Sequence, residues 1–174
     1  MSRFLPPGVP GKGPADGNGA PVTTARFVDR GVVRLVRYWT DHDSHSWRAI
    51  LARVMLKVLG VDWQPMCVGE GLVMPHATTG SVVHRRTRIG RDVMVFHGVT
   101  VGRARPWAER ARPGIDEGVV LEDGVVLGAN STVMFRAGHT LRIGRGTILG
   151  AGSVLLQSTG PGEVWAGNPA VRVR

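Results

Sequence analysis

The sequence predicts an all-β fold in which short strands wind into stacked triangular coils, a parallel β-helix preceded by a short helical pair. Three observations predict it: an aliphatic residue recurs at every sixth position from Val68 onward, small residues follow it where the chain must turn, and the same phase returns in separate runs. The clearest run is Ile143-Gly-Arg-Gly-Thr-Ile followed by Leu149-Gly-Ala-Gly-Ser-Val. Three hexads make one coil, and stacking the coils buries a continuous aliphatic column. Residues 68–157 would supply about five coils, enough for stability by stacking.

The six-residue frame is interrupted in three places. Residues 76–88 are irregular, and residues 102–114 form an excursion with the composition of a loop. Residues 134–142 carry about four residues more than the repeat requires. Loops that leave a regular scaffold often hold binding groups, so we expect functional residues at these interruptions.

The chain divides into three parts. Residues 1–22 are rich in Pro, Gly and small polar residues and are expected to form a disordered tail. Residues 23–60 show apolar residues at helical spacing and predict a helical N-terminal segment of two helices. The polar turn between them, from Asp41 to His45, fits an interhelical loop better than a metal site, because no spacing fixes a coordination geometry. Residues 61–174 form the predicted β-helix domain.

Composition narrows the environment and the partners. The single cysteine, Cys67, excludes a disulfide within the chain and favours the reducing cytoplasm. The sequence has neither an apolar run long enough for a bilayer nor a signal-peptide core, so no membrane partner is expected. The net charge of +9 is spread along the chain without a nucleic-acid-binding motif. It therefore favours the phosphates of a small cofactor over nucleic acid.

Four segments of the chain have a distinctive sequence: Met74-Pro-His-Ala-Thr-Thr-Gly80, Val95-Phe-His-Gly-Val-Thr-Val-Gly102, Ile143 to Leu156, and Val164-Trp-Ala-Gly-Asn-Pro-Ala-Val-Arg172. Through these segments the chain resembles the hexapeptide-repeat acyltransferases, most closely the serine O-acetyltransferase branch, over roughly residues 62–174. The resemblance implies a left-handed β-helix, a homotrimer, acetyl-CoA as the acyl donor, and active sites between neighbouring subunits.

His76 is the predicted catalytic residue. Acetylation of a hydroxyl needs a base near neutral pH, and imidazole suits that role. By resemblance the family's catalytic histidine corresponds to His76; the alternative is a histidine packed on a coil corner. Asp62, in the stretch Asp62-Trp-Gln-Pro65, resembles the family's aspartate that orients this imidazole. His97 stands where relatives carry glutamine, and it is either a substrate ligand or alternative base or a structural residue.

The resemblance also implies a binding site for CoA. Small residues at coil corners would let the pantetheine arm approach the backbone, and arginines would contact phosphates. The residues assigned to CoA are Gly102, Arg103, Ala129, Ala151, Gly152, Asn168, Pro169 and Arg172. No metal is expected, because His76, His84 and His97 lack the spacing of a three-histidine zinc site.

Departures from the family concern the acceptor. Pro75 replaces the family's aspartate before the catalytic histidine, and Arg112-Pro113 replaces the histidine-proline of the extended loop. In relatives the two replaced groups hold serine, so Arg112 could instead pair with an acceptor carboxylate or phosphate. We expect direct transfer of acetyl to serine, or alternatively to a sugar or secondary-metabolite hydroxyl. A hypothesis of another class is a non-catalytic β-helix that serves as an assembly partner.

Overall fold

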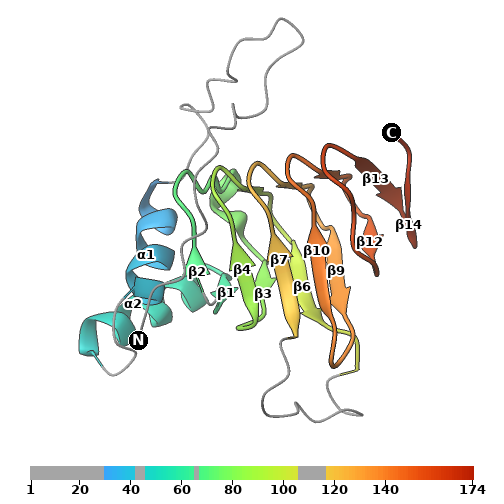
Figure 1. Cartoon of the computed structure of the whole chain (residues 1–174). Coiled ribbons are helices and arrows are strands. Elements are labelled where there is room, and N and C mark those ends of the chain that lie inside the picture. The colour runs from blue at the N-terminus through green and yellow to red at the C-terminus, as the bar shows by residue number, and fades with distance from the viewer. Residues whose placement is uncertain (1–29, 42–45, 65–66, 106–116) are drawn as a thin grey trace, which may run out of the picture.

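The computed structural model describes residues 30–41, 46–64, 67–105 and 117–174 (Figure 1). The expected tail, residues 1–22, lies outside the described residues. Two helices come first, α1 (Arg30–Asp41) and α2 (Trp47–Val58), both within the segment 23–60. The strands are β1 (Asp62–Trp63), β2 (Cys67–Val68), β3 (Val82–Val83), β4 (Thr87–Ile89), β5 (Met94–Val95), β6 (Thr100–Arg103), β7 (Gly118–Leu121), β8 (Val126–Leu127), β9 (Thr132–Phe135), β10 (Thr140–Ile143), β11 (Ile148–Leu149), β12 (Val154–Leu155), β13 (Val164–Gly167) and β14 (Ala170–Arg172).

The strands form three sheets, and the chain visits them in turn. Face 1 has the order β1-β3-β6-β9-β12, face 2 has β10-β7-β4-β2, and face 3 has β14-β13-β11-β8-β5. Neighbouring strands pair in parallel except β13 and β14, which are antiparallel. Each passage across the three faces is one coil, and Figure 1 shows the coils stacked along the molecule. The parallel β-helix, predicted from the hexads, and the short helical pair, predicted from the helical spacing of apolar residues, are both confirmed.

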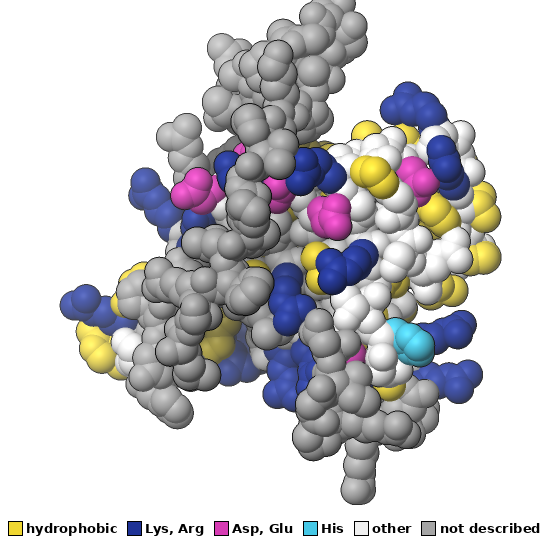
Figure 2. Space-filling model, in the orientation of Figure 1, with side chains coloured by type: hydrophobic (Ala, Val, Ile, Leu, Met, Phe, Trp, Pro, Cys, Tyr) yellow, Lys and Arg dark blue, Asp and Glu magenta, His cyan; other side chains and the backbone are white. Residues whose placement is uncertain are grey.

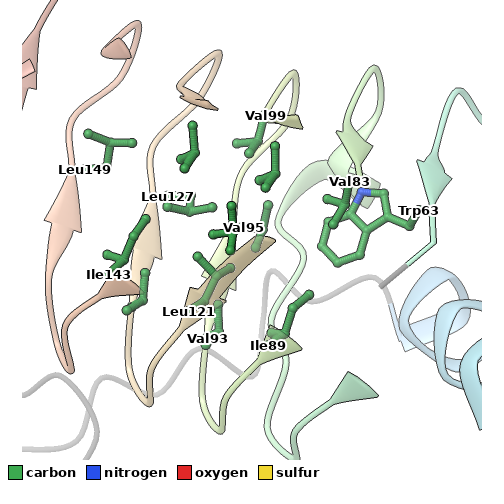
Figure 3. Packing of buried hydrophobic residues seen from close by; sticks show 14 of the residues in the cluster. Trp63, Val83, Ile89, Val93, Val95, Val99, Leu121, Leu127, Ile143 and Leu149 are labelled. Atoms are coloured by element: carbon green, nitrogen blue, oxygen red, sulfur yellow. The ribbon is translucent and has the colours of Figure 1, made fainter. Parts of the chain in front are cut away.

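In-register pairing explains why an aliphatic residue recurs at every sixth position. Because parallel partners lie directly above one another, equivalent residues of successive coils form buried columns. Figure 3 shows these side chains pointing into the interior. The columns are Val83, Val101, Val133 and Leu155 on face 1, Ile89, Leu121 and Ile143 on face 2, and Val95, Leu127 and Leu149 on face 3.

The two helices lie at the first-coil end of the β-helix (Figure 1). Val32 and Val36 of α1 belong to the same buried cluster as the coil residues. The buried residues of helix α2 are two alanines and one leucine, namely Ala49, Ala52 and Leu56. Its outer side exposes a run of large apolar side chains, Trp47, Ile50, Leu51, Val54, Met55, Val58 and Leu59. Across the described residues, no helix is long and apolar enough to cross a bilayer.

The corners between faces carry the irregular segments. We call the corner leading from face 3 to face 1 the 3–1 edge, and the corner leading from face 1 to face 2 the 1–2 edge. The 3–1 edge consists of residues 74–81, 96–99, 128–131 and 150–153 in successive coils. The 1–2 edge includes residues 84–86, 104–105, 136–139 and 156–158. Of the predicted excursion 102–114, residues 102–103 belong to β6, and residues 106–114 lie outside the described residues.

Candidate active site

The 3–1 edge brings together several residues that are far apart in the sequence. A ladder of backbone hydrogen bonds connects its corners: Gly98 N–H donates to the Thr79 carbonyl at 2.9 Å, Asn130 N–H to the His97 carbonyl at 2.9 Å, and Gly152 N–H to the Ala129 carbonyl at 2.8 Å. The first corner, residues 74–81, is longer than the others and contains the short 3₁₀-helix His76–Thr78. The predicted residues His76, His97, Ala129, Ala151 and Gly152 therefore line one edge.

The His76 side chain is exposed on this edge, and its backbone is held in an uncommon conformation. Its φ is +56° and that of Thr78 is +51°, both in the left-handed region that residues with a Cβ seldom adopt. Such conformations persist only where the surroundings impose them, and they concentrate at functional sites. The 3₁₀ turn thus presents the imidazole to solvent at a fixed position.

Pro75 explains how this turn is fixed. In the next two coils the equivalent backbone amides, of Phe96 and Gly128, donate to Leu127 and Leu149 carbonyls of the following coil. Pro75 stands at the corresponding position of the first coil and has no N–H to donate. The Thr78 hydroxyl takes its place and donates to the Val95 carbonyl at 3.1 Å. Thr78 is fully buried, so this bond satisfies an acceptor that water cannot reach.

A second set of buried hydrogen bonds supports the same turn. The Trp63 indole N–H donates to Ser81 Oγ at 2.6 Å. Ser81 Oγ donates in turn to the Thr78 carbonyl at 2.6 Å. Trp63 and Ser81 are both buried. Sequence reasoning missed these two residues, because no spacing shows that an indole and a hydroxyl 18 positions apart meet beneath the histidine.

His97 is the ring that contacts His76. The two imidazoles meet edge to face, with their centroids 5.7 Å apart and their planes at 84°. His97 Nδ1 is buried and has no hydrogen-bond partner among the described residues. Asp62 makes no such contact: its carboxylate accepts a hydrogen bond from Gln64 Nε2 at 3.3 Å, and none of the described interactions joins it to His76. The role predicted for Asp62 stays a prediction, whereas His97 lies in the site.

The edge offers groups that suit an extended amide-bearing ligand. The amide N–H groups of Ala129 and Ala151 have no acceptor among the described residues. A Cβ added to Gly152 would meet open space, and its φ of +66° favours glycine. The Asn168-Pro169 peptide is cis and lies in the β13–β14 turn beside this edge, because Gly167 N–H donates to Ser153 Oγ at 3.2 Å.

Arg172, on strand β14, forms an exposed ion pair with Glu163 at 3.1 Å. Hydrogen bonds from the Trp165 indole and the Gly160 amide, together with Arg172, lower the pKa of the Glu163 carboxyl. This ion pair ties the last strand to the end of the β-helix. The role predicted for Arg172 at the adenine end of CoA stays a prediction.

Two predicted CoA residues lie elsewhere, at the end of β6 on the 1–2 edge. A Cβ at Gly102 would face the Met134 side chain, 3.5 Å from its sulfur. The Arg103 side chain is 10% exposed and donates to Glu117 Oε1 at 2.5 Å, so its guanidinium already binds a carboxylate. The role predicted for Arg103 at a CoA phosphate stays a prediction. Arg112, the predicted acceptor contact, lies outside the described residues.

Glu117 is a buried carboxylate that sequence reasoning missed. Its side chain is 2% exposed, and it accepts a hydrogen bond from Gly138 N–H at 2.7 Å and lies 3.4 Å from Arg86. Burial alone would raise its pKa, but the Gly138 amide and the arginines outweigh burial and lower it. Burial, with Arg85, Arg103 and Arg86 nearby, also lowers the pKa of His84. Glu117 and His84 therefore belong to the 1–2 edge and not to the site around His76 and His97.

The part of the chain that the structure describes contains no cluster of three or more His, Cys, Asp or Glu side chains suited to a metal ion. His84 packs against the Phe135 ring at 5.2 Å, apart from the two imidazoles of the 3–1 edge. The arrangement of His76 and His97 is instead suited to proton transfer: one exposed imidazole, a second one beside it, and an edge with free amides.

Comparison with known proteins agrees with this reading. No family model matches the chain. It is 34% identical over 139 residues to serine acetyltransferase 2 of Arabidopsis thaliana, an alignment that covers 79% of this chain and 39% of that protein. The soybean serine acetyltransferase apoenzyme superposes with a TM-score of 0.66 at 31% identity, covering 82% of this chain and 56% of that one. A Neisseria gonorrhoeae serine acetyltransferase in complex with serine gives a TM-score of 0.66 at 29% identity, covering 84% and 57%.

The chain spans less than two thirds of the length of these relatives. The similarity nevertheless extends over most of this chain. The predicted left-handed sense of the β-helix is therefore confirmed together with the fold class. On this sequence and structural similarity, the chain belongs to the hexapeptide-repeat acyltransferases, in the serine acetyltransferase-like branch.

Proposed function

We propose that this protein is an acetyl-CoA-dependent O-acetyltransferase that acts on a small hydroxyl acceptor, with serine as the first candidate. The observation that carries the proposal is the exposed His76 imidazole, held on a buttressed turn at an edge lined by small residues. The relatives' names support the reaction, and the Neisseria structure with bound serine supports the acceptor.

In the proposed reaction His76 acts as a general base. It removes the proton from the acceptor hydroxyl while the oxygen attacks the thioester carbonyl. The C–S bond then breaks, and the sulfur of CoA takes the proton back from His76, so the imidazole is neutral again at the end. His97 lies close enough to bind the acceptor or to hold the His76 ring. Backbone amides on the same edge would polarise the carbonyl oxygen.

The free amides of Ala129 and Ala151 would bond the carbonyls of the pantetheine arm, with the open corner at Gly152 admitting it. The cis Asn168-Pro169 turn would then lie toward the nucleotide end. We further propose a cytoplasmic homotrimer with each active site between two subunits. Its support is the resemblance to the hexapeptide-repeat acyltransferases, which implies an assembly of this kind.

The test is acetyl transfer from acetyl-CoA, measured by thiol release, with serine and a panel of sugars as acceptors. His76→Ala should lower kcat by about 10²–10⁴-fold, the usual contribution of a positioned base. Arg91→Ala is the matched control, because Arg91 is an exposed corner residue away from the 3–1 edge. If wild-type protein neither binds CoA nor releases thiol with any acceptor, the enzyme proposal fails and a non-catalytic assembly partner replaces it.

The comparison of His76→Ala with His97→Ala assigns the base. A larger loss in His97→Ala than in His76→Ala would show that the second imidazole takes the proton. His97→Gln introduces the glutamine that the family resemblance implies at this position. It should retain most of the transfer activity if His97 serves as a ligand rather than as a base.

A further inference from the structure

A groove on the 1–2 edge lies apart from the imidazole pair. It consists of two adjoining hollows of about 400 and about 460 Å³, which share Arg136 and Leu156. Each has the size of a pocket for a small molecule. The first is lined by Phe135, Arg136, His139, Thr140, Leu141, Leu156, Gln157 and Ser158, and the second by Ala104, Arg105, Met134, Arg136 and Leu156.

The lining of the groove is positively charged. Among the described residues, its lining contains Arg105, Arg136 and His139 and neither aspartate nor glutamate. Among the described residues, neither arginine side chain has a hydrogen bond or an ion pair. The carboxylate on the same edge, Glu117, is already bound by Arg103 and by the Gly138 amide. In the view of Figure 2, basic side chains also lie beside an exposed histidine on the surface.

Two of the three basic side chains of the groove come from a turn that is additional to the six-residue repeat. Arg136 and His139 belong to the turn 136–139, which lies within the segment that exceeds the six-residue repeat. The turn is fixed from within: Gly138 N–H donates to Glu117 Oε2 at 2.7 Å, and His139 N–H donates to the Arg136 carbonyl at 3.2 Å. The half-exposed Leu156 side chain forms an apolar wall opposite. The added residues therefore place cations beside an apolar surface in a fixed geometry.

We propose that this groove binds a phosphate group carried by one of the two substrates. Two unpaired guanidinium groups and an imidazole suit a dianion better than a single carboxylate, and guanidinium matches phosphate oxygens in bidentate geometry. The proposal rests on the acyltransferase function proposed above. The phosphate comes either from CoA, which carries a 3′-phosphate, or from a phosphorylated hydroxyl acceptor.

Titration calorimetry with CoA, dephospho-CoA and inorganic phosphate tests the groove without turnover. The test variant is Arg136→Gln. The control is Arg142→Gln, since Arg142 is also exposed but lies on strand β10 outside the lining. If CoA is the source, Arg136→Gln weakens CoA binding roughly tenfold to a hundredfold, as loss of a charged hydrogen bond does, and leaves dephospho-CoA binding unchanged. If the acceptor is the source, CoA binding is unchanged and KM for a sugar phosphate rises by a similar factor.

The proposal is overturned if Arg136→Gln matches wild type in all three respects: the Kd of CoA, the Kd of inorganic phosphate, and the KM of phosphorylated acceptors. Unchanged thermal melting shows that the variant is folded, which is expected because Arg136 is exposed. Failure of the groove and failure of the enzyme remain distinguishable. If acetyl transfer is present and all three measurements are unchanged in Arg136→Gln, only the groove is rejected, whereas Arg136-dependent phosphate binding without any transfer rejects only the enzyme.

Discussion

Replacing Thr78 with valine should destabilise the protein by removing one hydroxyl. Valine keeps the shape and the β-branching of threonine, so the left-handed backbone at this position is not further strained. What is lost is the donor to the Val95 carbonyl. Leaving a buried acceptor unsatisfied costs about 1–3 kcal/mol. Thr78→Ser retains the hydroxyl and should remain close to wild type.

Pro75 supplies a sharper test of the same reasoning. Pro75→Ala restores a backbone N–H at the position where the next coils use theirs, and its backbone angles of −61° and 142° are open to alanine. With this second donor present, Thr78→Val should cost less than half of what it costs beside proline. The four proteins form a double-mutant cycle, measured by urea unfolding, with an expected coupling of about 0.5–3 kcal/mol for residues in one network.

The same cycle should appear in catalysis if His76 is the base. A displacement of the imidazole by about 1 Å can cost 10²-fold in rate. Thr78→Val should therefore lower kcat, while KM changes by a smaller factor. Adding Pro75→Ala to Thr78→Val should recover part of the lost kcat. Equal destabilisation by Thr78→Val in both backgrounds would refute the claim that the hydroxyl substitutes for the missing N–H of proline.

Three further predictions follow from the described residues. Glu117→Gln should cost about 3–5 kcal/mol in urea unfolding, because it leaves the buried Arg103 guanidinium without a counter-charge; wild-type-like unfolding would contradict this. The pKa of His84 is lower in the folded protein, so the unfolded chain takes up a proton at His84 first as the pH falls. The free energy of unfolding of the wild type should therefore fall as pH drops from about 6.5 through the folded pKa, and this pH dependence should be weaker in His84→Gln. Leu56→Ala should lower the free energy of unfolding by about 2–5 kcal/mol, whereas Val58→Ala, on the exposed side of the same helix, should lower it by under about 0.5 kcal/mol. A comparable loss for both would show that the outer face of the helix is covered.

Much of the fold could be predicted from the sequence because the six-residue period reflects a local rule. Each coil turns at the same three corners, so Leu121, Leu127, Ile143 and Leu149 occupy the interior in every coil where the phase holds. The phase fails where the chain leaves the coil. At those places the sequence indicated an irregularity but not its shape, as with the turn that contains Arg136.

The candidate site was predictable only in part. Resemblance pointed to His76, and the 3–1 edge does place it with His97, Ala129 and Gly152. For Arg103 the sequence did not indicate the carboxylate that binds it, because Glu117 follows a long excursion and no local pattern joins the two.

The sequence by itself determined the coil and the position of its corners, since these depend on spacing along the chain, and its resemblance to a family indicated His76 as the candidate base. Only the tertiary structure decided that a threonine hydroxyl replaces the missing proline N–H, that an indole and a serine support the turn from below, and which arginines remain unpaired. Hydrogen bonds and ion pairs between coils depend on which side chains meet across the stack. These contacts depend on how the coils stack and on the length of every loop between them, so they cannot be predicted from any single stretch of sequence.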